Sequence, residues 1–188
     1  MPNHCYQNVN IQGPRSLVRL IYDHLNTDTD NLTKQFCQLV LPMPFELHNA
    51  PKTVWSGYAV ESWYKWRVEN WGTKWDVADV EITDDLEEQG SRFDESATAE
   101  FEFSCWTAWS PPVPVWDKLH ELGVRVTADY QDEGGMFEGR YENGVNESWD
   151  PEFEKQKEND CECGLTEDGT WSEELFDQNG CTCEKEDA

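Results

Sequence analysis

Four of the seven cysteines lie near the C-terminus in two C-x-C pairs, and each pair adjoins a glycine. Four thiolates in two close pairs can complete a tetrahedral Zn²⁺ site, and a neighbouring glycine permits the tight turns that such ligands need. The spacing differs from the C-x-x-C of zinc knuckles, so a reduced tail, or cysteines that cross-link adventitiously, is the alternative interpretation. The candidate zinc ligands are Cys161, Cys163, Cys181 and Cys183.

Acidic side chains are the second candidate group. The chain carries 14 Lys and Arg against 39 Asp and Glu, a formal net charge of −25. Residues 1–80 hold seven basic and eight acidic residues, whereas residues 81–188 hold seven and 31. Such a field repels nucleic acid and anionic membranes and attracts basic protein surfaces. We predict partner-binding anions at Asp84, Asp85, Glu87, Glu88, Asp94, Glu95, Asp132, Glu133 and Glu138.

This charge distribution suggests a protein that imitates DNA. Duplex DNA carries one charge about every 1.7 Å of helix axis, and a dense run of carboxylates on a folded surface can present a comparable field. The expected partner is a basic protein, such as a nuclease, a restriction factor or another DNA-binding defence protein, with no direct contact to nucleic acid or membrane. A solvated acidic surface, and a zinc-stabilised interaction module in which the acidity is incidental, are the alternatives.

The sequence lacks the motifs of common catalytic sites. No P-loop, H-E-x-x-H or G-x-S-x-G pattern occurs, and none of the four histidines stands beside a nucleophile motif. Adjacent carboxylates could pair for acid–base or Mg²⁺ chemistry, but such neighbours are expected among 39 acids. We therefore expect a protein that is not an enzyme, with a small enzyme of unfamiliar type as the alternative.

Two tryptophan-rich stretches, 63–75 and 106–116, could form a base-stacking platform. Ferredoxin-like sheets stack RNA bases on exposed aromatic rings. A nucleic-acid platform also needs cations for the phosphates, and the second half of the chain is strongly negative. The sequence therefore favours core packing for these rings.

Hydrophobic periodicity predicts the elements that must position these residues. Alternation predicts four strands, and spacing near 3.6 residues, after turn signals such as Gly13-Pro14, predicts two helices. A third helix, 62–71, ends at Gly72, and Asn143-Gly144 predicts a hairpin turn. The strands are 5–12, 75–82, 97–106 and 124–130, and the two helices are 14–26 and 113–122. The residues expected to share one face of each element are Phe101, Phe103 and Cys105 of 97–106, Leu17, Leu20, Ile21, His24 and Leu25 of 14–26, and Val115, Leu119 and Leu122 of 113–122.

Two further segments are expected to be irregular. Residues 39–47 contain two prolines and should be extended rather than paired. Residues 83–96 should form a charged loop that carries most of the candidate anions.

The element order predicts an α+β fold, a ferredoxin-like split βαβ antiparallel sheet with helices on one face. The first domain is expected to span 1–141 with an insert around 27–74, and 142–188 should form an acidic, Cys-containing C-terminal extension. The N-terminus shows no basic and apolar signal, and no run approaches 18 apolar residues. These features favour a soluble cytoplasmic protein with reduced cysteines.

Five short motifs occur in order between residues 1 and 145. They are Met1-Pro2-Asn3-His4-Cys5, Pro42-Met43-Pro44-Phe45, Asn70-Trp71-Gly72-Thr73-Lys74-Trp75-Asp76, Thr107-Ala108-Trp109-Ser110-Pro111-Pro112, and Tyr130 followed by Glu133-Gly134. Together they resemble a family of phage and plasmid proteins called YubB-like, described as having a ferredoxin-like domain. The family usually has Trp where this chain has His4, and the acidic tail lies outside the resemblance.

The resemblance implies a fold and a mobile-element origin, and it assigns no catalytic residues. With the charge distribution, it suggests an accessory phage or plasmid protein that inhibits a host DNA-binding defence or DNA-processing protein.

Overall fold

The computed structural model describes residues 3–27, 35–47, 62–91 and 96–151. The chain divides into two units, Met1–Ser148 and Trp149–Ala188. The described residues fold as an α+β protein in which helices accompany one antiparallel sheet, as the sequence predicts.

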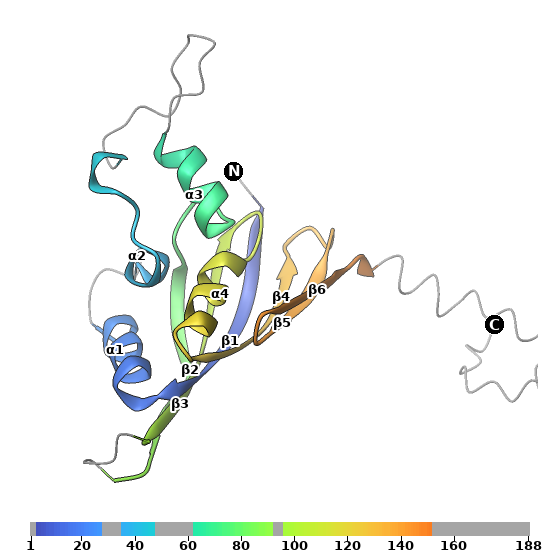
Figure 1. The fold of residues 1–188 in the computed structure, drawn as a ribbon. Helices are drawn as coiled ribbons and strands as arrows, with labels where there is room; N and C mark the ends of the chain where they lie inside the picture. Colours follow the sequence, from blue (N-terminus) through green and yellow to red (C-terminus); the bar gives the residue numbers. More distant parts are fainter. Residues whose placement is uncertain (1–2, 28–34, 48–61, 92–95, 152–188) are drawn as a thin grey trace, which may run out of the picture. The chain divides into compact units, whose positions relative to one another are not determined.

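The sheet of the described residues has six strands in the order β2-β3-β1-β4-β5-β6. Strand β1 occupies the centre and pairs antiparallel with β3 on one side and β4 on the other, while β2 forms an edge. Figure 1 shows this arrangement. The strands are β1 His4–Pro14, β2 Ala78–Gln89, β3 Thr98–Ala108, β4 Arg125–Asp132, β5 Glu138–Glu142 and β6 Val145–Trp149.

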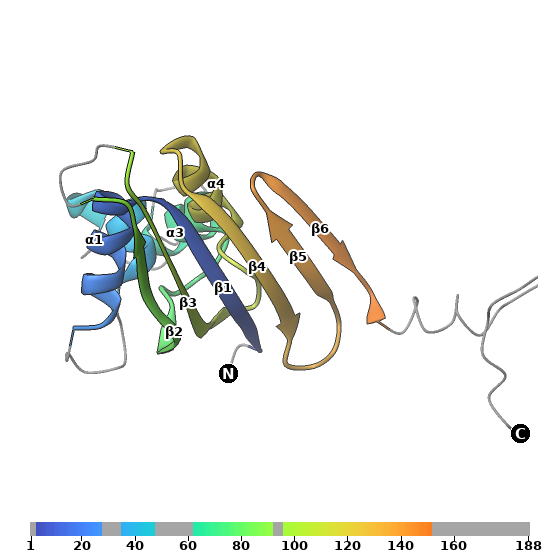
Figure 2. The same ribbon diagram turned by 90° about the horizontal axis from the view of Figure 1, so that it is seen from below.

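The helices lie on one face of the sheet (Figures 1 and 2). Those of the described residues are α1 Arg15–Leu25, α2 Phe36–Val40, α3 Trp63–Trp71 and α4 Val113–Glu121, with a 3₁₀ turn η1 at Phe45–Leu47. Helices α1, α3 and α4 confirm the three predicted helices. None of the described helices is long and apolar enough to cross a membrane.

Alternation along the central strands builds the core. In β3, Phe101, Phe103 and Cys105 share one buried face, as predicted, and Val9 and Ile11 of β1 face the same layer. Side chains of successive strand residues point to opposite faces, so each strand gives one row to the core and one to the other surface. Burying large apolar side chains in this way stabilises the fold by about 1.5–3 kcal/mol each.

The buried stripe of α1 differs in part from the predicted one. Val18, Ile21 and Leu25 are buried against the sheet, whereas Leu20, expected on the stripe, is 55% exposed. Leu122 was expected to face inward and is instead 49% exposed, because α4 ends at Glu121 and Leu122 is the residue that caps it; Trp116 and Leu119 are buried.

Strand β2 corrects the prediction of a charged loop at 83–96. The strand runs through this segment to Gln89 and pairs with β3 as far as Thr98. Val80, Ile82 and Leu86 are half-buried and pack against the core, which keeps the acidic segment extended. The alternation continues past residue 82, but register shifts between β2 and β3 interrupt it.

Residues 39–47 are unpaired, as predicted, but they are not extended throughout, because helix α2 covers 39–40 and η1 covers 45–47. The first residues of α2, Phe36 and Cys37, are buried, and the carboxylate of Asp76 accepts hydrogen bonds from the backbone N–H of Cys37 and Gln38, at 2.7 and 2.9 Å. A carboxylate at a helix N-terminus satisfies amides that have no partner within the helix. Pro42 and Pro44 lie in the irregular stretch 41–44 between α2 and η1.

The predicted hairpin at Asn143-Gly144 is confirmed. Both residues have positive φ, 48° and 94°, as a type I′ turn requires, and they join β5 to β6. This hairpin carries the sheet beyond residue 141, where the sequence places the end of the first domain. Residues 152–188 of the acidic extension lie outside the described part of the chain.

Candidate functional site

The face of the sheet opposite the helices, here called the open face, carries the side chains that alternate with the buried rows. It is dominated by carboxylates and amides, with aromatic rings at one end. Besides residues of β2, it comprises His4, Tyr6, Asn8, Asn10 and Gln12 of β1, Glu100, Glu102, Ser104 and Trp106 of β3, Arg125, Thr127, Asp129 and Gln131 of β4, and Glu138, Arg140 and Glu142 of β5.

Amides of the central strand hold a carboxylate in place on this face. Asn10 Nδ2 donates to Glu100 Oε1 at 3.0 Å, and Gln12 Nε2 donates to Glu100 Oε2 at 2.8 Å. Neutral donors orient Glu100 without cancelling its charge, so the face keeps a fixed anion for an incoming cation. On β4, Asp129 is instead neutralised by Arg140 at 3.0 Å.

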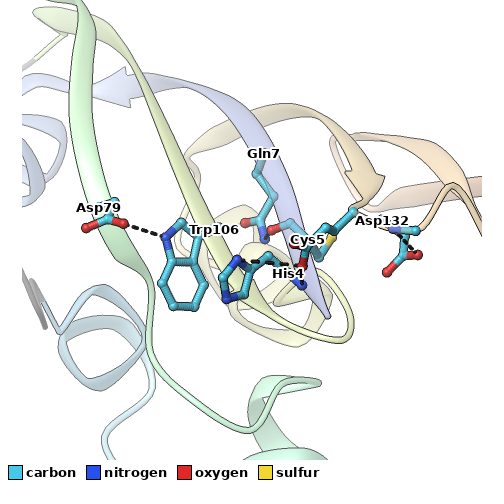
Figure 3. A network of polar contacts seen from close by, with 8 residues as sticks. His4, Cys5, Gln7, Asp79, Trp106 and Asp132 are labelled. Carbon is cyan, nitrogen blue, oxygen red and sulfur yellow. Dashed lines mark hydrogen bonds and ion pairs between the residues drawn. The ribbon is translucent and has the colours of Figure 1, made fainter. Parts of the chain in front are cut away.

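An aromatic group occupies the end of the open face near the N-terminus (Figure 3). The rings of His4 and Trp106 stack with centroids 4.0 Å apart. The rings of His4 and Tyr6 meet edge to face, with centroids 6.2 Å apart. The indole Nε1 of Trp106 donates to Asp79 Oδ2 at 2.8 Å. Tyr6 remains 42% exposed, so this end offers an aromatic surface beside carboxylates.

Asp79 reaches Trp106 because the edge strand is bulged there. The pairing of β2 with β3 shifts register between Ala78 and Glu81, and Asp79 lies inside the shift with φ 48°. Bulges of this kind turn a side chain toward a new direction, and positive φ is uncommon outside glycine. The sequence gives no signal for this contact, and Tyr6, Asp79 and Trp106 were all missed as site residues.

The acids of β2 divide between the two faces of the sheet. Asp84 lies opposite Glu102, and Glu87 lies opposite Glu100. Because residues paired across antiparallel strands point to the same side, these four carboxylates share the open face. Like charges directly opposite one another destabilise a sheet, so the fold holds here a repulsion that a bound cation would relieve.

Asp85 and Glu88, also predicted as partner-binding anions, face α1 instead. Asp85 Oδ1 accepts from the hydroxyl of Tyr22 at 2.9 Å, and Glu88 Oε1 pairs with Arg19 Nη1 at 3.0 Å. The hydrogen bond raises the pKa of Tyr22. These two carboxylates therefore have partners within the chain.

The other predicted anions occupy different surroundings. Asp132 is buried, and its Oδ2 accepts from the backbone N–H of Gly134 and Met136, at 2.9 and 3.3 Å, so its charge organises the turn after β4. Glu133 is half-exposed and accepts from the backbone N–H of His4 at 2.9 Å. Glu138 is half-buried on β5. Asp94 and Glu95 lie outside the described residues.

The candidate zinc ligands Cys161, Cys163, Cys181 and Cys183 also lie outside the described residues. Cys5, Cys37 and Cys105 are free and buried among the described ones. Burial raises the pKa of Cys5 to about 12 and raises that of Cys37 and Cys105 as well, which keeps all three as thiols rather than reactive thiolates. Within the described ranges, no three His, Cys, Asp or Glu side chains gather in a way that could hold a metal ion.

No family model matches the chain, and no curated protein matches it. Among solved structures, the chain is similar to api92 from Yersinia pseudotuberculosis, whose crystal structure carries the family model DUF1281, with a TM-score of 0.44 and 8% sequence identity. The match covers 80% of this chain and 98% of that one. We base no argument about fold or function on a likeness this distant.

Proposed function

We propose that the open face binds a basic surface of another protein, and that the protein acts as an acidic, DNA-mimic-like inhibitor of a host DNA-binding defence or DNA-processing protein. One observation carries the proposal: Asp84 lies opposite Glu102 and Glu87 opposite Glu100 on a face that none of the described helices covers. Folding does not require these carboxylates to face one another, and their repulsion destabilises the sheet. A cationic partner that binds them would remove this repulsion.

The spacing of these carboxylates suits a row of cations. Alternate residues of a strand lie about 6.8 Å apart, and neighbouring strands about 4.8 Å apart. Two parallel rows of charge at this spacing are sparser than duplex DNA, which carries a charge about every 1.7 Å of axis. The open face therefore fits a short row of basic residues on a partner rather than the whole of a DNA-binding groove.

The aromatic end of the open face adds packing and stacking contacts to the charge pairing. Tyr and Trp are enriched among the residues that dominate interface energies, and Arg stacks on their faces while pairing with carboxylates. Tyr6 is exposed, and Trp106 is held beside the carboxylate of Asp79. The proposed partner surface therefore contains arginine, and the face itself contacts neither nucleic acid nor membrane.

We further propose that β1 to β4 form a ferredoxin-like split βαβ arrangement. The strand order β2-β3-β1-β4, with α1 after β1 and α4 between β3 and β4, supports this assignment. It also supports the resemblance to the YubB-like phage and plasmid family, from which the accessory role and the host-cell cytoplasm follow as proposals. The β5–β6 hairpin is an addition to this plan.

The alternative function is a zinc-stabilised interaction module. It rests on the two C-x-C pairs at Cys161, Cys163, Cys181 and Cys183. In that case binding would depend on the metal and not on the open face. Neither proposal assigns catalysis to the chain.

The experiment compares two variants that lose the same charge. Asp84→Asn/Glu87→Gln removes two carboxylates from the open face, and Asp85→Asn/Glu88→Gln removes two from the α1 side. A partner captured from host lysate is titrated with the protein in the presence of labelled duplex DNA. The open-face variant should compete about 30-fold or more less well, since each lost pair at a partly desolvated interface costs on the order of 1 kcal/mol or more.

The α1-side variant should compete like the wild type. Association should slow in the open-face variant and become less sensitive to salt. If both variants compete equally poorly, binding depends on net charge and not on the open face. If partner and duplex DNA bind at the same time with unchanged affinity, the DNA-mimic proposal is wrong.

A further inference from the structure

A second cluster lies at α3 and the turn that follows it, on the helix side of the sheet (Figure 2). Its cations lie over aromatic rings. Arg67 places its guanidinium carbon 5.3 Å from the ring centroid of Trp63, and Lys74 places Nζ 4.2 Å from that of Trp75 and 5.2 Å from that of Trp109. We call Trp63, Tyr64, Arg67, Lys74, Trp75 and Trp109 the tryptophan–cation cluster.

The two cations of this cluster make no ion pair within the described residues. Arg19, Lys65, Lys118 and Arg140 each pair with a carboxylate there, although Arg67 and Lys74 belong to the same strongly acidic chain. The Nε of Arg67 is buried without a hydrogen-bond partner. A desolvated donor without an acceptor is costly, and desolvation lowers the pKa of Arg67. Arg67 lies over the buried ring of Trp71, at 4.7 Å, and interacts with the charge of Asp76, so Lys74 is the cation of the cluster that can meet an external anion.

Trp109 joins the cluster through an unusual backbone conformation. Its φ is 74°, in the left-handed region that bulky residues rarely adopt, and its side chain is 40% exposed. The conformation is fixed on several sides: the N–H of Trp109 donates to Asn3 O at 3.0 Å, and Thr107 Oγ1 donates to Ser110 O at 2.7 Å. Strain that holds an exposed ring in position points to a ligand-contacting role.

The charge near this cluster differs from that of the open face. Residues 1–80, which supply all of the cluster except Trp109, hold seven basic and eight acidic residues. Charges farther away than about 8–10 Å are largely screened at physiological ionic strength. Carboxylates of the open face that lie beyond this distance therefore act only weakly on an anion bound at α3.

We propose that the tryptophan–cation cluster binds single-stranded nucleic acid. A base stacks on the exposed ring of Trp109, and Lys74 contacts a phosphate. Stacking on aromatic side chains beside cations is how single strands are held without sequence preference, because every base has a π-face. A duplex keeps its bases stacked inside and cannot use the ring in this way.

This proposal goes beyond the function proposed for the open face. The sequence favours core packing for the tryptophans because it shows no cations for the phosphates. The fold brings Trp109, from the stretch 106–116, beside Lys74, from the stretch 63–75, and so places a cation next to an exposed ring. Trp71 and Trp116 remain fully buried, so core packing holds for those rings and not for the cluster.

The test is a fluorescence anisotropy titration of labelled oligothymidylate, about 12 nucleotides long, with the whole protein in about 0.05 M salt. Trp109→Leu should weaken binding about 5- to 150-fold, the range for one stacked base. Lys74→Gln should weaken binding and lower the slope of log affinity against log salt by about 0.7, the value for one phosphate contact. Lys118→Gln, which removes a cation paired with Glu121, should change neither.

Circular dichroism would first show that each variant is folded. If Trp109→Leu does not fold, the titration of Lys74→Gln is the test of the proposal, because this variant removes a charge and leaves every ring in place. The proposal is overturned if the single strand does not bind, or if folded Lys74→Gln binds like the wild type. Equal affinity for a duplex of the same length would also overturn it, because stacking would then play no part.

Discussion

The opposed carboxylates of β2 and β3 allow a test of the open face that needs no partner. Asp84→Asn/Glu87→Gln removes two like-charge pairs, Asp84 with Glu102 and Glu87 with Glu100. Cross-strand pairs change stability by roughly 0.2–1 kcal/mol each, so this variant should raise the free energy of unfolding by about 1 kcal/mol. For a unit of this size, Tm should rise by about 2–4 °C.

The matched variant Asp85→Asn/Glu88→Gln should do the opposite. It removes the same charge but weakens the hydrogen bond from Tyr22 and the ion pair with Arg19. Each of these two exposed contacts contributes about 0.5 kcal/mol, so the variant should lose up to about 1 kcal/mol. Both variants relieve the general self-repulsion of an acidic chain equally, so that effect cancels in their difference.

Urea denaturation of the wild type and both variants measures this difference, which should be about 1–2 kcal/mol in favour of the open-face variant. In about 1 M salt, where the screening length falls to about 3 Å, the gain should shrink. A destabilised open-face variant, or a gain that salt leaves unchanged, would refute the reasoning. The carboxylates would then not repel one another across the strands, and the proposed function would lose its main support.

Asp76→Ala should destabilise the protein by about 2–4 kcal/mol in urea denaturation, because Asp76 is buried and accepts from the backbone N–H of Cys37, Gln38 and Val77. Burial raises the pKa of Asp76, so its contribution to stability should decline as pH rises through the folded-state value, and Asp76→Asn should remove that decline. For the zinc alternative, elemental analysis should find one Zn²⁺ per chain, lost in Cys161→Ser/Cys181→Ser; a wild type without zinc would end that proposal.

Local patterns predicted the elements that this protein builds from continuous hydrophobic repeats. The alternation of Phe101, Phe103 and Cys105 located β3, and Val115 and Leu119 located α4, because each pattern matches one period over its whole length. Helix α2 was missed because its N-terminus is satisfied by Asp76, a residue 39 positions beyond Cys37. Such a cap depends on tertiary contact and leaves no local signal.

The candidate site was predicted in part for a related reason. The sequence singled out acids of β2 as candidate binding residues, but it could not separate Asp84 and Glu87 from Asp85 and Glu88. That division depends on the register shifts between β2 and β3. A shift of one residue exchanges the two faces of a strand. The contact between Asp79 and Trp106 likewise exists only because of the bulge, so it had to be observed.

The register of β2 also separates the two proposed sites. It directs Asp84 and Glu87 away from the helices, while Arg19 neutralises Glu88 on the helix side. The two proposed sites therefore use different side chains, Asp84 and Glu87 on the open face and Lys74 in the tryptophan–cation cluster. Because the sites share no residue, the Lys74→Gln variant should leave duplex competition unchanged.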